Sequence, residues 1–188
     1  YYGVQTLRGK ENFHITGIPM SLEPNFIKAF GYAKKAAALA NRDLGVLDAK
    51  VADAIAKACD KLIAGEMRDQ FVTDFIQGGA GTSTNMNANE VIANLALESL
   101  GHKKGEYQHV NPNDHVNYGQ STNDMYPTAF RLALILRLES YMASLTALQE
   151  AFFAKGREFD KVLKMGRTHL QDAVPMSLGQ EFHGWGTT

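Results

Sequence analysis

Apolar residues recur at helical spacing along much of the chain, which predicts a mainly α fold. One stripe falls within residues 24–44, where Ser21 can cap the helix and Gly45 can end it. A second stripe follows Asp48, a candidate N-cap. A third helix is expected over residues 87–100. The apolar positions of the first two stripes are Phe26, Ile27, Phe30, Ala33, Ala37 and Ala40, and then Val51, Ile55, Ala58, Cys59 and Leu62.

The most unusual pattern lies in residues 126–163, where one long helix is expected. Apolar positions cover much of its circumference, with polar residues scattered between them. A long helix that is apolar on more than one face is normally buried among several partner helices. A chain of 188 residues offers too few partners, so the pattern predicts that copies of the chain associate through a helix bundle.

Two shorter elements complete the expected fold. A further helix is expected to begin near Pro175, because proline suits the first helical turn. Residues 3–7 and 11–15, joined through Arg8-Gly9-Lys10, carry a weak strand signal. They predict a small β-hairpin near the start of an otherwise helical protein.

Composition excludes several classes of protein. The chain has 19 Lys and Arg residues against 20 Asp and Glu, a net charge of −1. A nucleic-acid binder should show a basic domain, and a membrane-surface protein a polybasic segment. No apolar run approaches the roughly 20 residues that span a bilayer.

The single cysteine, Cys59, cannot form an internal disulfide, so a cytoplasmic protein is expected. The first residue is Tyr1 rather than Met, and we expect a fragment of a longer protein.

Three polar, glycine-rich segments stand out, at residues 78–90, 111–124 and 166–173. Turns and helix caps explain each one singly, but a cap needs one polar side chain and each segment has several. Free N–H groups and the dipole at a helix N-terminus attract anions, and neutral donors respond as charge grows during a reaction. We therefore predict a pocket for a small carboxylate, built from Thr82, Ser83, Ser121, Thr122, Asn123, Thr168 and His169.

The same segments carry a resemblance to a known family. Residues 1–8 with 11–13, and the runs 78–90, 104–128 and 165–182, resemble those of the aspartate ammonia-lyases, within the aspartase/fumarase superfamily. The similarity spans essentially the whole chain.

The resemblance implies a fold and an assembly. Residues 1–122 would form an amino-terminal helical domain, and residues 123–188 would begin a central domain of long helices. Four subunits would associate through those helices, and each active site would collect residues from three of them.

The resemblance also implies a reaction. Enzymes of this family remove a proton from C3 of a substituted succinate and expel a leaving group from C2, here ammonia from L-aspartate, which gives fumarate through an aci-carboxylate. Thr82, Ser121 and Thr122 would donate hydrogen bonds to that group, and Asn123 would contact substrate. Thr168 and His169 would bind the other carboxylate and the amino-group region. No metal or organic cofactor is implied.

The general base of the superfamily is a serine in a mobile Gly-Ser-Ser loop, downstream of the third segment. These 188 residues contain no such loop, so we expect no catalytic residue and no turnover in this chain alone. His169 is not expected to be the base, because some aspartases have glutamine there. His102, His109 and His115 with Asp114 match no standard metal spacing, so no metal is expected.

Two alternative functions remain open. Residues 166–171 and Gly184-Trp185 are similar to fumarases, which hydrate fumarate, whereas residues 1–3, 105–107 and 111–115 are more similar to aspartases. Some members of the superfamily are structural proteins, so a non-catalytic helical scaffold is the second alternative. The joint presence of all the candidate donors argues against it.

Overall fold

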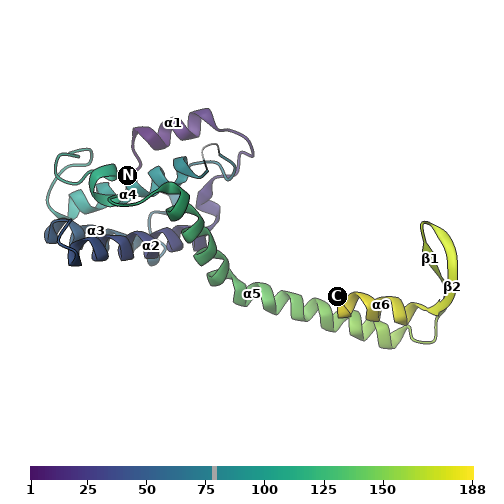
Figure 1. Cartoon of the computed structure of the whole chain (residues 1–188). Helices are drawn as coiled ribbons and strands as arrows, with labels where there is room; N and C mark the ends of the chain where they lie inside the picture. Colours follow the sequence, from purple (N-terminus) through teal and green to yellow (C-terminus); the bar gives the residue numbers. More distant parts are fainter. Residues whose placement is uncertain (78–79) are drawn as a thin grey trace. The chain divides into compact units, whose positions relative to one another are not determined.

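The computed structural model describes residues 1–77 and 80–188, and it confirms the mainly α class (Figure 1). The helices and strands, in chain order, are α1 Val4–Asn12, η1 Met20–Leu22, α2 Pro24–Asp43, α3 Ala49–Ile63, η2 Arg68–Gln70, α4 Thr82–Ser99, η3 Pro112–Val116, α5 Thr122–Glu158, β1 Leu163–Thr168, β2 Gln171–Ser177 and α6 Leu178–Thr187.

The chain divides into two compact units, Tyr1–Leu136 and Arg137–Thr188, and the division falls within α5. We call them the first and the second unit. The sequence placed a domain boundary at 122/123 instead, where α5 begins. That boundary remains a prediction about the longer protein.

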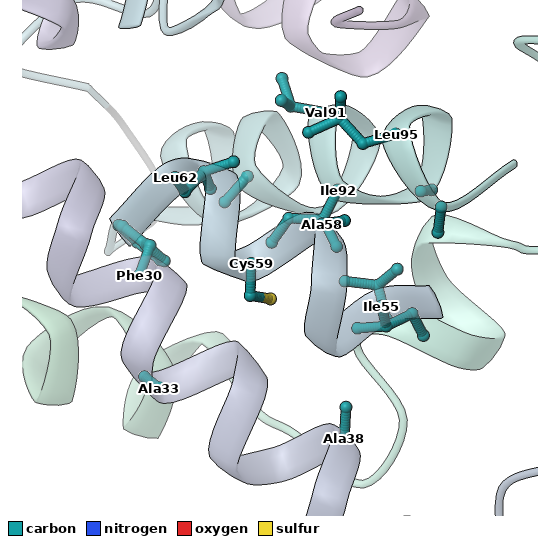
Figure 2. Close-up of a cluster of buried hydrophobic side chains, with 14 of the residues drawn as sticks. Phe30, Ala33, Ala38, Ile55, Ala58, Cys59, Leu62, Val91, Ile92 and Leu95 are labelled. Atoms are coloured by element: carbon teal, nitrogen blue, oxygen red, sulfur yellow. The ribbon is translucent and has the colours of Figure 1, made fainter. Parts of the chain in front are cut away.

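Helices α2, α3 and α4 form the core of the first unit. Side chains from all three interdigitate, as Figure 2 shows for ten labelled residues. The stripes expected in α2 and α3 contribute to this core together with α4, although Ala40 lies on the exposed side of α2. Cys59 is fully buried within it, and burial raises the pKa of its thiol to about 12. The cysteine is therefore a packing residue, as the sequence indicated.

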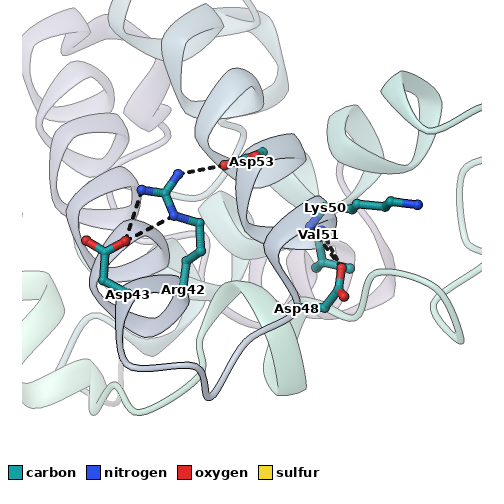
Figure 3. A network of polar contacts seen from close by, with 6 residues as sticks. All are labelled: Arg42, Asp43, Asp48, Lys50, Val51 and Asp53. Carbon is teal, nitrogen blue, oxygen red and sulfur yellow. Dashed lines mark hydrogen bonds and ion pairs between the residues drawn. The ribbon is translucent and has the colours of Figure 1, made fainter.

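The connection between α2 and α3 is fixed by polar contacts at the surface (Figure 3). Asp48 caps α3 by accepting hydrogen bonds from the backbone N–H groups of Lys50 at 2.9 Å and Val51 at 3.1 Å. The Arg42 guanidinium donates to Asp43 and Asp53. The expected N-cap of α3 is thus confirmed, and it satisfies N–H groups that a helix start leaves without partners.

The start of the chain corrects one expectation. Residues 3–15, predicted as a hairpin, contain the helix α1 instead. The buried carboxylate of Glu90, in α4, accepts hydrogen bonds from the N–H groups of Gly3, Gln5 and Thr6. A carboxylate at a helix N-terminus satisfies orphan donors and interacts favourably with the helix dipole.

The second unit holds the antiparallel hairpin of the fold. Strand β1 pairs with β2, with an irregularity between Met165 and Arg167. Pro175, expected near a helix start, lies in β2, and α6 begins only at Leu178. A capping box between Ser177 and Gln180 begins that helix.

Helix α5 begins four residues earlier than expected and ends at Glu158 rather than at residue 163. Within the second unit, α6 packs on the end of α5 through aromatic contacts that include Phe152 with Trp185 at 5.8 Å. In the part of the chain that the structure describes, no helix combines the length and apolar character needed to cross a membrane.

Candidate functional site

The first turns of α4 and α5 meet in the first unit. Thr82 is the first residue of α4, and Thr122 is the first residue of α5. The Asn85 side-chain amide, one turn into α4, donates a hydrogen bond of 3.0 Å to Thr122 Oγ1. The first turns of two helices, each of which begins with a threonine, are therefore joined by a hydrogen bond. Helix N-termini favour an anion.

The predicted residues at the start of α5 are accessible to a ligand. Ser121 Oγ accepts a hydrogen bond from the Asn123 N–H at 3.2 Å, and this fixes the first turn. Ser121 and Asn123 are exposed, and Thr122 is half-buried. Because Asn85 already donates to Thr122 Oγ1, the Thr122 hydroxyl proton is directed toward another acceptor.

A cleft of ≈ 500 Å³ adjoins this region. Asn123, Tyr126 and Pro127 of α5 line one side, and residues from the segment before α4 line the other, namely Phe75, Ile76, Gln77, Ala80 and Gly81. This volume falls in the range of small-molecule sites. Gly78 and Gly79, which belong to the predicted polar segment, lie outside the described residues.

Gln77 holds the segment before α4 against the helix. Its Oε1 accepts the Thr84 N–H at 2.8 Å, and its Nε2 donates to Thr84 Oγ1. Thr84 Oγ1 also lies 3.3 Å from Thr73 Oγ1. The side chain of Gln77 thus replaces a cap and positions Thr82 at the helix start.

A buried polar network that was not predicted from the sequence lies behind Thr122. Lys34 Nζ donates to Asn117 Oδ1 and to Gln120 Oε1, each at 2.8 Å. Asn117 Oδ1 also accepts from the amides of Asn85 at 3.1 Å and Asn89 at 3.2 Å. The network links the buried Lys34 amine to Asn85, the residue that contacts Thr122.

Lys34 is completely buried, and burial lowers the pKa of its amine to about 7. Its acceptors here are neutral amides. A signal for this residue existed in the sequence, because Lys34 lies one helical turn after Phe30 and one before Ala38, on the face that packs into the core.

Thr168 and His169 lie in the hairpin of the second unit. Thr168 pairs with Gln171, and the two residues between them, His169 and Leu170, have positive φ values of 50° and 63°. Both are exposed, Leu170 by 93%. Two residues with positive φ define the type of turn that normally contains Asn-Gly, so these side chains make the tip unfavourable by about 1–3 kcal/mol each. The predicted site residues thus form two groups, one in each unit: Thr82, Ser83, Ser121, Thr122 and Asn123 in the first, and Thr168 and His169 in the second.

The segment around His115 has a structural role. His115 Nδ1 accepts the Asn111 N–H at 2.8 Å. Asn111 Oδ1 accepts the N–H groups of Asn113 and Asp114. These hydrogen bonds cap the short helical turn η3. Among the described residues, His115 and Asp114 belong to no group of side chains close enough to share a metal ion.

The structure thus defines a mainly helical protein in which neutral hydroxyl and amide groups lie at the first turns of α4 and α5. A family model described as lyase matches residues 1–188, and the chain belongs to that family. The chain is 62% identical over 182 residues to an aspartate ammonia-lyase of Helicobacter pylori, covering 97% of this chain and 39% of the relative. An aspartate ammonia-lyase of Escherichia coli is 54% identical over 186 residues, with 98% and 39% covered.

Solved structures agree with this assignment. A fumarate lyase:delta crystallin from Brucella melitensis has a TM-score of 0.83 and 54% identity, and the match covers 100% of this chain and 44% of that one. A class II fumarase from Schistosoma mansoni has a TM-score of 0.79 and 40% identity, with 100% and 39% covered. The chain therefore spans about two fifths of the length of these relatives.

Gly81, which precedes α4, is expected to tolerate no side chain. Its φ is +92°, and an added Cβ would overlap the ring of Tyr126. We expect Gly81→Ala to lower the free energy of unfolding in urea by about 2–4 kcal/mol, because backbone strain and overpacking add. Gly45→Ala is the matched control: its φ is +71°, but a Cβ there meets nothing within 4 Å. An equal loss of unfolding free energy in the two variants would contradict the packing of Gly81 against α5.

Proposed function

We propose that the longer protein to which this chain belongs is a cytoplasmic lyase that eliminates ammonia from L-aspartate to give fumarate. The observation that carries the proposal is the hydrogen bond between Asn85 and Thr122, which brings the first turns of α4 and α5 together. Neutral hydroxyl and amide donors gather there, beside a cleft. The relatives named aspartate ammonia-lyase support the choice of substrate.

The chemistry of the site follows from these donors. Removal of the C3 proton from aspartate places a second negative charge on the adjacent carboxylate. Thr82, Ser121 and Thr122 would donate hydrogen bonds to it, and the two helix dipoles would strengthen them. Donors that are fixed before reaction stabilise such charge without reorganising. Asn85 contributes by holding Thr122 Oγ1, so that its proton faces the substrate.

The second group of donors supports a site shared between subunits. Thr168 and the strained His169 stand at an exposed hairpin tip, where the structure of the second unit alone gives no reason for non-glycine residues. Unfavourable backbone conformations persist where function requires them. We propose that Thr168 and His169 bind the other carboxylate and the amino-group region of a substrate held by another copy.

The surface of α5 supports the same assembly. In the second unit, large apolar side chains are exposed on successive turns, including Leu138, Tyr141, Met142, Leu145 and Leu148. Exposed apolar surface of this extent normally marks an interface. We propose a homotetramer in which these helices form a bundle, with a serine from outside these 188 residues as the general base. By this proposal the chain alone gives no turnover.

Thr122→Val in the longer protein tests the proposal. Valine keeps the branched shape and removes the hydroxyl, so kcat/KM for fumarate formation from L-aspartate, followed by ultraviolet absorbance, should fall by about 100- to 1,000-fold. Thr122→Ser should keep most of the activity. Thr128→Val, at an exposed position of the same helix, is the control and should leave the rate unchanged.

Three results would overturn the proposal. Full activity in Thr122→Val would remove Thr122 from the site. Hydration of fumarate without release of ammonia from L-aspartate would identify a fumarase, which the match to the Schistosoma mansoni enzyme keeps as the second candidate. Absence of both activities in the folded longer protein would favour the scaffold.

A further inference from the structure

Two histidines and a glutamate gather near the end of α4, away from the donors of the candidate site. The metal-binding atoms of His102, Glu106 and His109 all lie within 4.8 Å of one another. His102 Nδ1 is 3.6 Å from a carboxylate oxygen of Glu106. The rings of His102 and His109 stack at 3.8 Å between centroids. No such set was expected from the sequence, where His102 and His109 were considered with His115 and Asp114.

We propose that His102, Glu106 and His109 form a binding site for a divalent transition-metal ion, zinc above all. Two imidazoles and one carboxylate are a common ligand set for zinc, with water completing the coordination. Imidazole ligands also disfavour magnesium and calcium, which prefer oxygen. The site would be separate from the carboxylate-binding donors of α4 and α5.

The backbone that carries the three ligands is fixed in advance. The His102 N–H donates to the Leu97 carbonyl at 2.9 Å, and the His109 N–H donates to the Glu106 carbonyl at 3.0 Å. Between them, the Gly105 N–H donates to Asn94 Oδ1 at 2.9 Å. Binding therefore has to order side chains only, which limits its entropic cost.

Neighbouring groups support a cation at this position. The Lys103 N–H donates to Glu106 Oε2 at 3.0 Å and so orients the carboxylate, as outer-shell partners of metal ligands do. Lys104 is directed elsewhere, because its ammonium group pairs with Glu98 at 3.6 Å and lies over the Tyr1 ring. The Lys104 ammonium group is therefore held by Glu98 and the Tyr1 ring rather than by the three proposed ligands.

One side chain must move for all three ligands to bind. An imidazole nitrogen binds metal within its ring plane, and the two rings are inclined by only 9°. Parallel stacked rings cannot share an ion, and the ligand atoms must close to about 3.4 Å around a tetrahedral zinc. His109 is exposed, so rotation about its side-chain torsions is unhindered by core packing. Binding should therefore break the stacking of the two rings.

Calorimetric titration of the 188-residue protein with zinc chloride tests the proposal. We expect one site with a dissociation constant in the micromolar range. His109→Ala should weaken it by at least about tenfold, since even outer-shell partners of a metal contribute that much. Glu106→Gln keeps the size of the side chain and should also weaken binding. His14→Ala removes an exposed histidine outside the cluster and should change nothing.

Nitrogen chemical shifts of the imidazoles give a second measurement, which identifies the histidines that bind. On addition of zinc, ring nitrogens of His102 and His109 should shift together, and those of His14 and His183 should not. A folded His109→Ala variant that binds zinc as tightly as the parent would overturn the proposal. So would a titration that detects no site, or zinc-induced shifts confined to other histidines.

Discussion

Glu90→Ala is expected to lower the free energy of unfolding of the first unit by about 3–5 kcal/mol, because several buried donors lose their acceptor at about 1–3 kcal/mol each. The Glu90 carboxylate accepts from Gly3 N–H at 2.8 Å, Gln5 N–H at 2.9 Å and Thr6 N–H at 3.0 Å, and from Thr6 Oγ1 at 2.5 Å. It is only 2% exposed. Water cannot readily replace it, so the start of α1 should detach. Urea unfolding measures the cost, and hydrogen exchange of residues 4–12 reports the detachment.

The control lies on the same helix. Glu98 is exposed and accepts from the Tyr1 hydroxyl at 2.6 Å. Glu98→Ala should cost about 1 kcal/mol or less, because exposed charged contacts contribute little. Glu90→Gln keeps one acceptor oxygen and should fall between the two. If Glu90→Ala and Glu98→Ala cost the same, or if exchange in α1 is unchanged, the carboxylate does not anchor the helix.

This contact also explains why the hairpin predicted for residues 3–15 was wrong and α1 is found there. A segment of nine residues has few apolar positions from which a period can be read, and it ends without a strong local signal. What holds the helix is a carboxylate 87 positions away from Gly3. Helices α2 and α3, by contrast, carry their own apolar stripes, and both were predicted close to their observed bounds. The expected cap of α3 by Asp48 is present, but the expected cap of α2 by Ser21 was wrong, because Ser21 lies in η1 and Glu23 stands at the N-cap position of α2.

The candidate site likewise combines residues with a local sequence signal and residues that come together only through contacts between distant segments. Ser121, Thr122 and Asn123 could be proposed as donors at a helix start because local composition is visible in one stretch of sequence, and the structure confirms that α5 begins there. The network of Lys34, Asn85 and Asn117 forms only after α2, α4 and the segment before α5 pack together. Its members are single polar residues within otherwise ordinary segments, so a reading along the chain cannot assemble them.

The hairpin of β1 and β2 also departs from what its local sequence predicts. Its turn contains His169 and Leu170 at positive φ, where the sequence signal for such a turn would be Asn-Gly or a related pair. Pro175 was taken as a helix start because proline is common there, yet it lies in β2. Prolines are accepted in two-stranded ladders at positions that need no N–H donor. Function at the tip would explain why the residues depart from the local preference.

Replacing Lys34 with methionine is expected to remove a rise in stability with pH. Burial lowers the pKa of the Lys34 amine in the folded protein to about 7, against an ordinary value of 10.5. Between these values the unfolded chain binds more protons than the folded one, so the free energy of unfolding increases with pH. From pH 7 to pH 9 the expected increase is about 2 kcal/mol for this one group.

Cys59 sets the upper end of the pH range in which this effect of Lys34 can be measured alone. Burial raises the pKa of its thiol from 9.0 to about 12, so above pH 9 the unfolded chain loses this proton first, and the contribution of Cys59 then opposes that of Lys34. Urea unfolding at pH 7, 8 and 9 therefore isolates the lysine. Because other groups titrate in both proteins, the quantity to follow is the difference between the parent and Lys34→Met, which should change by about 2 kcal/mol across the window.

Lys35→Met is the matched control, because the neighbouring lysine is half-exposed and pairs with Asp60 at 2.6 Å. It should keep the pH dependence of the parent. In Lys34→Met, Asn117 Oδ1 retains the donors of Asn85 and Asn89, so the variant should fold. Parallel pH profiles for the parent and Lys34→Met would mean that the amine is hydrated in solution. The network behind Thr122 would then not be a dry, fixed support for the Thr122 hydroxyl, which the proposed function requires.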